Sequence, residues 1–278
     1  MRIILLIIFA FAVTNCNSRK LQSSQELNVL FVGNSLTYFH DMPQTLQLML
    51  DETHPNIKID QITCPGQSLP GHLSNIITSR TENSISTRKK EPGETTETEH
   101  KITEKNWDII ILQTGTVSVL IPENRDLKLN KAISDIKKLA TNPECEFILF
   151  NTWPSKKEYP KHYCYSSSRI DESIDKDECC SPTIQNLEQE IKLINESYDL
   201  VAQEHGLIKS NNGTKYYDVL TKYLEIELYD DDIHPNKNGA FLNACVFYQL
   251  LTGKKVTKLK FNGDIEPNTA ELLKKISE

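Results

Sequence analysis

Short apolar runs alternate with longer amphipathic segments along most of this chain. The runs at 27–32, 57–62, 107–112 and 146–150 have the length and the β-branched content of strands. Because the clearest of these runs are continuously apolar, we expect strands that helices cover on both faces. Strands that alternate with helices predict an α/β fold: a three-layer α/β/α sandwich with a parallel, flavodoxin-like sheet of about five strands and right-handed crossovers.

Helices are predicted where apolar residues recur every three or four positions. These segments are 42–50, 127–140, 183–204, 237–252 and 268–276. Asp41 and Asn236 are placed to cap helix N-termini, and Gly206 and Gly253 to cap C-termini. A weaker pattern predicts a short strand at 207–208, a turn at 211–213 and one more helix.

We expect a single domain over 27–278, because 38% hydrophobic and 25% charged residues are enough for one sizeable core. Two stretches interrupt the pattern. Residues 79–105 are rich in Thr, Glu, Lys and Ser, which predicts a surface excursion. Residues 155–182 hold many Tyr, Ser and Cys residues without a period, which predicts an ordered insertion over the functional edge of the sheet.

The N-terminus has the pattern of a signal peptide. An apolar run at 3–13 follows Met1 and Arg2 and is too short to span a bilayer, so we assign residues 1–15 to the signal. Cys16 then resembles the lipidated cysteine of bacterial lipoproteins, although Asn15 replaces the usual small residue before it. Residues 16–26 form a polar tether. We expect an exported cell-envelope lipoprotein that contacts the membrane through this anchor; a cleaved, freely secreted protein is the alternative.

Six cysteines remain beyond Cys16, which suits an oxidising compartment. Cys164 could form a disulfide with either Cys179 or Cys180, whereas Cys64 and Cys245 lie in apolar segments and are expected in the core. Zinc is a weaker alternative for the cysteines, because no second CxxC or His pair stands at ligand spacing. We expect no metal and no cofactor.

Net charge is −7 and no long Lys/Arg block exists, so nucleic acid is not an expected partner. The acidic trio 230–232 could suggest calcium, but it lacks the dispersed oxygen ligands of a calcium loop.

Polar turns follow each of the predicted strands. Gly33 ends the first strand and Ser35 follows two positions later, Gly66 follows the second strand, and Gln113 follows the third. Because ligands collect beyond the carboxyl ends of parallel strands, Ser35 is placed where chemistry would occur. A serine nucleophile needs a base and an orienting partner, and the segment 231–235, read D-D-I-H-P, offers both.

These residues resemble the ordered sequence blocks of the SGNH, or GDSL-type, hydrolases. The matching positions are Gly33-Asn34-Ser35-Leu36, Gly66, Gln113, and Asp231 with His234-Pro235. The resemblance implies Ser35 as nucleophile, His234 as general base, and Asp231 as the acid that orients His234. Asp230 and Asp232 are the competing carboxylates.

The resemblance also implies an oxyanion hole built from the backbone N–H groups of Ser35 and Gly66. A third donor is commonly an asparagine side chain, where this chain has Gln113; the Gly115 backbone is the alternative. Asn34 stands where aspartate is frequent. Asn34, Asn151 and Trp153 are candidates for contact with substrate, although a core or turn role is equally open for Asn151 and Trp153.

The expected activity is that of a serine esterase that works through an acyl-enzyme, and similar exported proteins often remove O-acetyl groups from carbohydrates. A lipase or thioesterase acting on longer acyl chains is one alternative. A non-catalytic glycan-binding surface lipoprotein on the same scaffold is another. Four of the histidines outside the motif, at 40, 54, 72 and 162, are expected to be surface or hydrogen-bonding residues.

Overall fold

The computed structural model describes residues 26–81 and 84–278. The predicted signal peptide and Cys16 therefore lie outside the described residues. No helix in the described part of the chain is long and apolar enough to cross a membrane.

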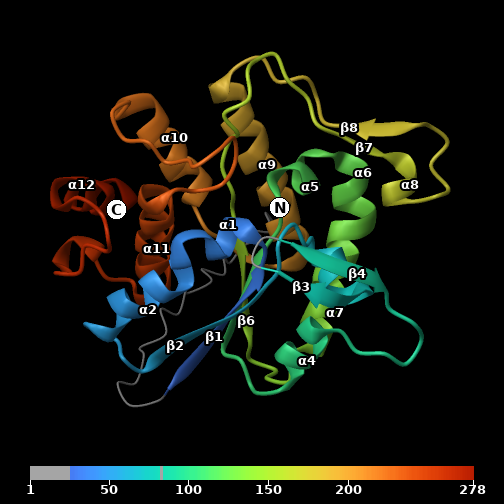
Figure 1. The fold of residues 1–278 in the computed structure, drawn as a ribbon, viewed down its shortest axis with the longest axis horizontal. Coiled ribbons are helices and arrows are strands. Elements are labelled where there is room, and N and C mark those ends of the chain that lie inside the picture. The colour runs from blue at the N-terminus through green and yellow to red at the C-terminus, as the bar shows by residue number, and fades with distance from the viewer. Residues whose placement is uncertain (1–25, 82–83) are drawn as a thin grey trace, which may run out of the picture.

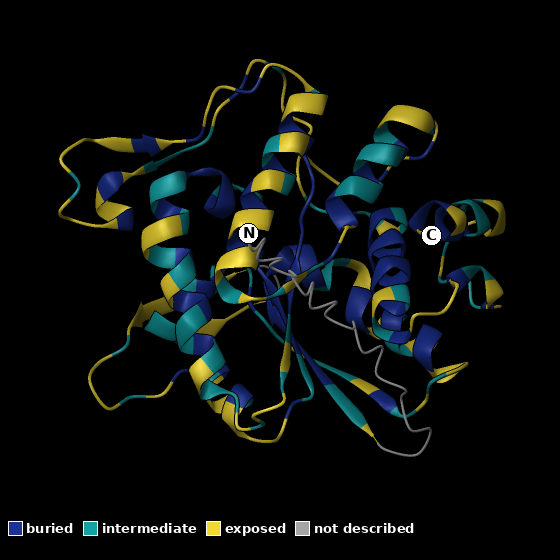
Figure 2. Ribbon diagram, turned by 180° about the vertical axis from the view of Figure 1, so that it is seen from behind, coloured by how far each residue is buried: buried dark blue, intermediate teal, exposed yellow. Residues whose placement is uncertain are grey.

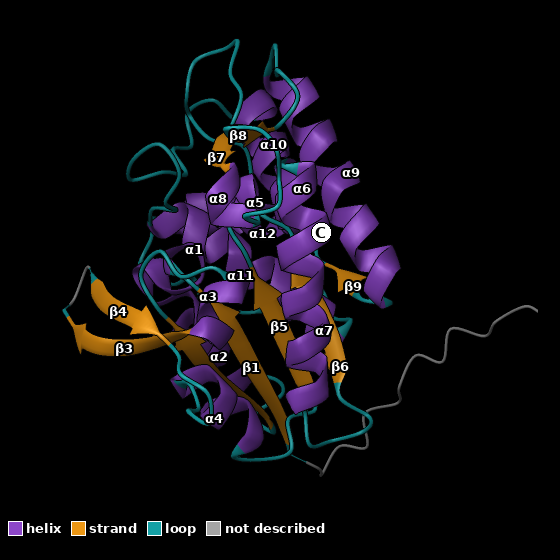
Figure 3. Ribbon diagram, turned by 90° about the vertical axis from the view of Figure 1, so that its right-hand side faces the viewer, coloured by secondary structure: helices purple, strands orange, loops and turns teal. Residues whose placement is uncertain are grey.

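The central sheet has five strands, all parallel, in the order β2-β1-β5-β6-β9. Their bounds are β1 (Leu27–Gly33), β2 (Ile57–Thr63), β5 (Ile109–Gln113), β6 (Glu146–Phe150) and β9 (Ile208–Lys209). Helices lie on both sides of this sheet, as Figures 1 and 3 show. The predicted fold class is confirmed, with strand ends shifted by up to two residues.

Both faces of β1 are buried, which explains its uninterrupted apolar sequence. Val29 and Phe31 face one hydrophobic cluster, and Leu30 and Val32 face the other. All four side chains are fully buried. In Figure 2 the burial colours show buried sheet residues inside, while the outer helices carry exposed stripes.

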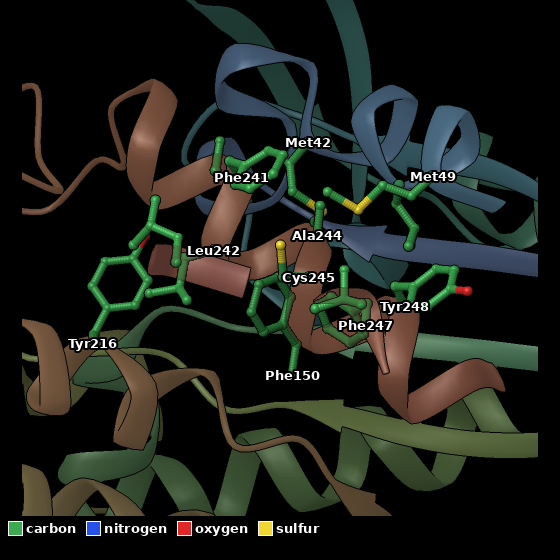
Figure 4. Close-up of a cluster of buried hydrophobic side chains, with 14 of the residues drawn as sticks. Met42, Met49, Phe150, Tyr216, Phe241, Leu242, Ala244, Cys245, Phe247 and Tyr248 are labelled. Carbon is green, nitrogen blue, oxygen red and sulfur yellow. The ribbon is translucent and has the colours of Figure 1, made fainter. Parts of the chain in front are cut away.

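Four helices pack on one face of the sheet: α2 (Met42–Asp51), α10 (Asn212–Lys222), α11 (Lys237–Thr252) and α12 (Pro267–Ser277). Figure 4 shows this core, in which Phe247 of α11 lies against Phe150 of β6. The ring centroids of this pair are 4.7 Å apart in an edge-to-face arrangement. Cys245 is buried in the same cluster, as expected.

Five helices pack on the other face: α3 (Leu69–Ser74), α4 (Glu97–Thr103), α5 (Thr116–Leu120), α7 (Asn130–Leu139) and α9 (Leu187–His205). A short helix α6 (Pro122–Asn124) and a π turn η2 (Arg125–Leu129) run directly into α7. The remaining one-turn segments are α1 (Ser35–Tyr38), η1 (Phe39–Asp41) and η3 (Val256–Lys258).

Three of the four predicted helix caps are confirmed. Gly206 and Gly253 end α9 and α11 in the left-handed region, with φ of 63° and 65°. The Asn236 side chain accepts a hydrogen bond from the Gly239 N–H at the start of α11. The prediction for Asp41 is wrong: it has a positive φ of 51° and its side chain caps nothing.

The predicted surface excursion 79–105 is correct only in part. A hairpin of β3 (Asn75–Arg80) and β4 (Ile85–Lys89) extends from the sheet with exposed residues. Helix α4 follows, however, and its Ile102 is fully buried. Thr96 and Glu99 cap this helix reciprocally. One apolar anchor in a polar segment is too weak a periodic signal, which is why the helix was not predicted.

The insertion 155–182 is ordered and folds back on itself. It contains β7 (Cys164–Ser166), α8 (Ser167–Ile170) and β8 (Glu178–Cys180), and the two strands pair antiparallel. A disulfide joins Cys164 to Cys180, whereas Cys179 is buried beside Ile121 and Ile170. The disulfide decides between the two predicted pairings. It also takes both sulfurs from the group with His162 that could otherwise hold a metal.

Candidate active site

Ser35 stands on a tight turn at the carboxyl end of β1. It is the first residue of α1, and Asn34 caps that helix by accepting a hydrogen bond from the Leu36 N–H, N···O 3.1 Å. A Cβ on Gly33 would lie 2.6 Å from Thr37 Oγ1 and 2.7 Å from Gln113 Oε1. Glycine is therefore required here, because the turn passes directly over the side chains of Thr37 and Gln113.

Ser35, His234 and Asp231 form one hydrogen-bonded chain. His234 Nε2 lies 2.8 Å from Ser35 Oγ, and His234 Nδ1 lies 2.6 Å from Asp231 Oδ2. Asp231 Oδ1 accepts from the backbone N–H groups of Ile233 and His234, both at 2.8 Å. This geometry places a base on the serine hydroxyl and a carboxylate on the base.

A closed loop presents both the acid and the base. Tyr229 pairs with Pro235 across it, and the Asp230 N–H donates to the His234 carbonyl at 3.0 Å. Asp230 instead binds His40, 2.6 Å from carboxylate oxygen to Nε2. Of the three adjacent aspartates, the structure therefore brings Asp231 to the imidazole.

Hydrogen bonds keep Asp231 ionised. Partial burial raises the pKa of its carboxyl group, but the N–H groups of His234 and Ile233 and the His234 ring outweigh burial and lower that pKa to about 2. Asp231 is a carboxylate at neutral pH and can stabilise an imidazolium on His234.

Phe39 forms a wall of the site that the sequence pattern did not reveal. Its ring is stacked on His234 with the centroids 4.3 Å apart and the planes 12° apart. His40 and Asp41, the next two residues, both have positive φ, 49° and 51°. An aromatic residue four positions after a serine carries no signal of its own, so only the three-dimensional arrangement identifies it.

Two backbone N–H groups, those of Ser35 and Gly66, are the predicted oxyanion donors. Ser35 is the first residue of its helix and Gly66 lies in a turn, and within the described residues neither N–H makes a hydrogen bond. Gly66 has a positive φ of 64° and open space where a Cβ would be. Free N–H groups of this kind are what an oxyanion hole requires.

Gln113 is fully buried beneath the serine turn. Its Oε1 accepts from the Asn34 N–H at 2.8 Å and from Thr37 Oγ1 at 3.1 Å, which fixes the orientation of the amide. Its Nε2 is buried and has no partner among the described residues. A buried amide donor without a partner is unusual. The predicted donor role of Gln113 thus has a free N–H available to it.

The candidates for substrate contact take positioning roles instead. Asn34 Nδ2 donates to the Gln67 carbonyl at 3.0 Å and is buried. Asn151 Oδ1 accepts from the Gly213 N–H at the start of α10, and Trp153 Nε1 donates to the Ile233 carbonyl at 2.9 Å. Asn151 and Trp153 are almost fully buried. Trp153 donates to the loop that carries His234, and of the two roles left open for Asn151 and Trp153 the structure shows the buried one.

His72 is buried rather than on the surface. Its Nε2 lies 2.9 Å from the Gly33 carbonyl oxygen, and its Nδ1 lies 2.7 Å from Thr98 Oγ1. Since a carbonyl only accepts, Nε2 carries the proton and Nδ1 accepts from the Thr98 hydroxyl. Burial lowers the pKa of His72 to about 4, partly opposed by the bond to Gly33. A neutral imidazole therefore fastens the last residue of β1.

Two pockets border these residues. One, of about 490 Å³, is lined by His40 and Asp41 of η1 and by Phe241, Phe261 and Asp264. The other, of about 420 Å³, includes Gly66 and Gln67, and it extends beneath the insertion to Tyr165 and Arg169. In Figure 1 the β7-β8 hairpin and α8 lie beyond the same end of the sheet as α1.

With this geometry in view, sequence comparison gives a family. The sequence family described as "Domain of unknown function (DUF4886)" matches residues 28–276. The chain belongs to the DUF4886 family. No curated protein matches it closely enough to count as a relative.

Solved structures similar to this DUF4886 protein include a second family member, from Bacteroides uniformis. That structure has a TM-score of 0.66 at 16% identity, and the match covers 91% of this chain and 93% of the other. A protein from Slackia heliotrinireducens, assigned to the SGNH hydrolases, has a TM-score of 0.54 at 17% identity, with 82% and 100% covered. A variant of an acetylxylan esterase from Geobacillus stearothermophilus has 0.50 at 12% identity, with 82% and 95% covered.

These similarities establish the fold. This DUF4886 protein has the SGNH hydrolase fold, which confirms the resemblance found in its sequence. At such identities the structures say nothing about substrate, so the activity must be argued from the site itself.

Proposed function

We propose that this protein is a serine esterase of the SGNH type. The observation that carries the proposal is the chain of two hydrogen bonds, 2.8 Å and 2.6 Å long, from Ser35 through His234 to Asp231. Ser35 and the pair Asp231 and His234 come from two segments about two hundred positions apart. Only the tertiary fold brings these two segments together.

The geometry supports a two-step reaction. His234 Nε2 takes the proton of Ser35 Oγ as the oxygen attacks the ester carbonyl carbon, and then gives that proton to the departing alcohol. The acyl group remains on Ser35. A water molecule deprotonated by His234 then attacks the acyl-enzyme and releases the acid, and Ser35 regains its proton. Asp231 stays ionised throughout and holds the imidazole by Nδ1.

The N–H groups of Ser35 and Gly66 are the proposed donors to the tetrahedral oxyanion, and Gln113 Nε2 is the third. Each such donor contributes roughly 3 kcal/mol to the transition state in comparable sites. The support for Gln113 is its free, buried Nε2 and the fixed orientation that the Asn34 N–H gives its amide.

The leading substrate is an O-acetylated carbohydrate. The support is a pocket beside Gly66 that is large enough for a sugar ring. The fold is shared with an acetylxylan esterase, which makes acetate the first acyl group to test. Lipases and thioesterases would use the same residues, but they would prefer long acyl chains to acetate.

A panel of nitrophenyl esters and acetylated oligosaccharides tests this proposal. The parent should hydrolyse acetate esters, and Ser35→Ala and His234→Ala should lower kcat by at least about a thousandfold while the thermal midpoint stays near that of the parent. A parent without turnover that still binds glycans would favour the non-catalytic alternative. Turnover that survives in folded Ser35→Ala would refute the mechanism.

We also propose export with lipid attachment at Cys16. The support is the apolar run at 3–13 and the disulfide between Cys164 and Cys180, which suits an oxidising compartment. Palmitate labelling of the parent that disappears in Cys16→Ser is the expected result. Labelling that persists in this variant would contradict the assignment.

A further inference from the structure

The pocket beside Gly66 is lined by three basic side chains. Lys89 comes from β4, Lys128 from η2 and Arg169 from α8, so three separate elements direct cations to one place. Among the residues that the structure describes, no carboxylate lines this pocket. In a protein of net charge −7, such a gathering of positive charge is not expected from composition.

These cations are not ion-paired with acidic side chains in the part of the chain that the structure describes. None of the three forms an ion pair anywhere in 26–81 or 84–278, whereas Lys90, the next residue after Lys89, binds Glu99 at 2.6 Å. Lys128 donates to the Arg169 carbonyl, and Lys89 Nζ lies 3.1 Å from Asn75 Oδ1. Lys89 and Lys128 also line an adjoining pocket that does contain carboxylates, those of Glu99, Asp135 and Asp171, but neither lysine is ion-paired with them.

The basic side chains are also held in place. The Arg169 guanidinium lies over the Tyr165 ring, 4.1 Å from its centroid, and the Cys164–Cys180 disulfide closes the hairpin that carries Tyr165. The pKa of Lys128 is lowered, first by burial and then by Lys89 and Arg169, with Asp171 acting in the opposite direction. The three positive charges are therefore close enough to repel one another, and an anion placed among them would relieve that repulsion.

The pocket begins at the proposed oxyanion hole. Gly66 lines it, and the next residue, Gln67, is tied to the serine turn by the hydrogen bond from Asn34 Nδ2. A substrate bound at Ser35 that extends past Gly66 would enter the pocket lined by Lys89, Lys128 and Arg169.

We propose that the portion of the substrate that enters this pocket carries an anionic group, a carboxylate or a sulfate. This inference rests on the proposed esterase function and narrows its substrate to acidic glycans. Lysine and arginine bind a carboxylate or a sulfate through charge-assisted hydrogen bonds. The inference therefore concerns the negative charge that the two groups share.

The test compares three acetylated substrates: a galacturonate oligomer, a sulfated galactose oligomer and a neutral xylose oligomer. The parent should prefer at least one anionic oligomer by about tenfold or more in kcat/KM, and added NaCl should reduce that preference. The oligomer that is preferred shows whether the pocket binds a carboxylate or a sulfate. The double variant Lys89→Gln/Arg169→Gln should lose about tenfold or more on that oligomer and keep its kcat/KM on nitrophenyl acetate.

Lys90→Gln is the matched control, because its lysine is adjacent to Lys89 but paired with Glu99. It should leave both activities unchanged. Calorimetry measures the binding of the unacetylated oligomers to Ser35→Ala without turnover. Anion binding can therefore be tested even if the protein proves to have no esterase activity. Equal kcat/KM on acidic and neutral oligomers, or equal binding by Ser35→Ala with and without the two Gln substitutions, would overturn the inference while leaving the esterase function intact.

Discussion

The rings of Phe39 and His234 lie face to face, with their centroids 4.3 Å apart, so the proposed base is stacked against a residue only four positions after the proposed nucleophile. The π face of Phe39 can orient the imidazole and stabilise the imidazolium that forms when His234 takes the serine proton. Serine, base and aromatic wall thus form one compact unit at the end of β1.

Phe39→Leu should lower kcat by about two- to twelvefold, because an aromatic contact of this kind contributes about 0.5–1.5 kcal/mol. Phe39→Tyr keeps the ring and should stay close to the parent. Steady-state kinetics on nitrophenyl acetate measure both. Equal losses in the two variants would mean that the ring does not act on His234.

Asp231→Asn should lower kcat by about a hundredfold or more. The neutral amide lacks the negative charge that stabilises the imidazolium, and its NH2 group can favour the wrong tautomer of His234. Asp230→Asn is the matched control: it alters the adjacent aspartate, which binds His40 instead, and should cost less than about threefold. Since the pKa of Asp231 is about 2, pH–rate profiles should show no ionisation of this carboxylate above pH 4. A larger loss of kcat in Asp230→Asn than in Asp231→Asn would show that Asp230, and not Asp231, is the acid that orients His234.

His72 should make the unfolding free energy depend on pH. Its pKa is about 4 in the folded protein and 6.5 as a free side chain, so the unfolded chain binds the extra proton between these values. Stability from this residue is complete above pH 6.5 and is lost as the pH falls to 4, by about 3 kcal/mol in all.

Urea unfolding of the parent and of His72→Gln, at pH 4 and pH 7, isolates this term. Burial lowers the pKa of His54 and His205 as well, so the quantity to compare is the difference between parent and variant. That difference should be smaller at pH 4 than at pH 7. The same difference at both pH values would show that His72 does not titrate as described.

Gln113→Met should reduce kcat by about a hundredfold if Nε2 donates to the oxyanion. It should also destabilise the fold by about 1–3 kcal/mol, because the buried Asn34 N–H loses its acceptor. Thr37→Val removes the other hydrogen bond to Oε1 but leaves Nε2 in place, so it should change kcat by less than about fivefold. Comparable kcat losses in both variants would limit Gln113 to positioning.

The sequence predicted the sheet well because its inner strands are buried on both faces. Leu30 and Val32 meet one core while Val29 and Phe31 meet the other, and this arrangement leaves an unmistakable apolar run. Helix α4 was missed because a reciprocal cap and one buried apolar residue, Ile102, suffice to hold it. Such a segment carries almost no periodic pattern.

The site was predictable where residue type and spacing determine the chemistry, and not where packing does. Asp231 stands three positions before His234, and the hydrogen bond between them is local. Trp153, by contrast, lies just after the carboxyl end of β6, a position typical of pocket residues. Its indole nevertheless donates to the Ile233 carbonyl and stacks on Tyr216. Whether such a side chain turns inward depends on partners far away in the sequence.

The pairing of Tyr229 with Pro235 closes the segment that holds Asp231 and His234 into a loop, called here the acid–base cassette. Its two working groups keep their mutual geometry through contacts inside that cassette, so folding has one distant alignment to achieve rather than two. Moving this site to another α/β scaffold would accordingly require two fragments, the serine turn at the end of β1 and the acid–base cassette. The distance to control between them is the one from Ser35 Oγ to His234 Nε2.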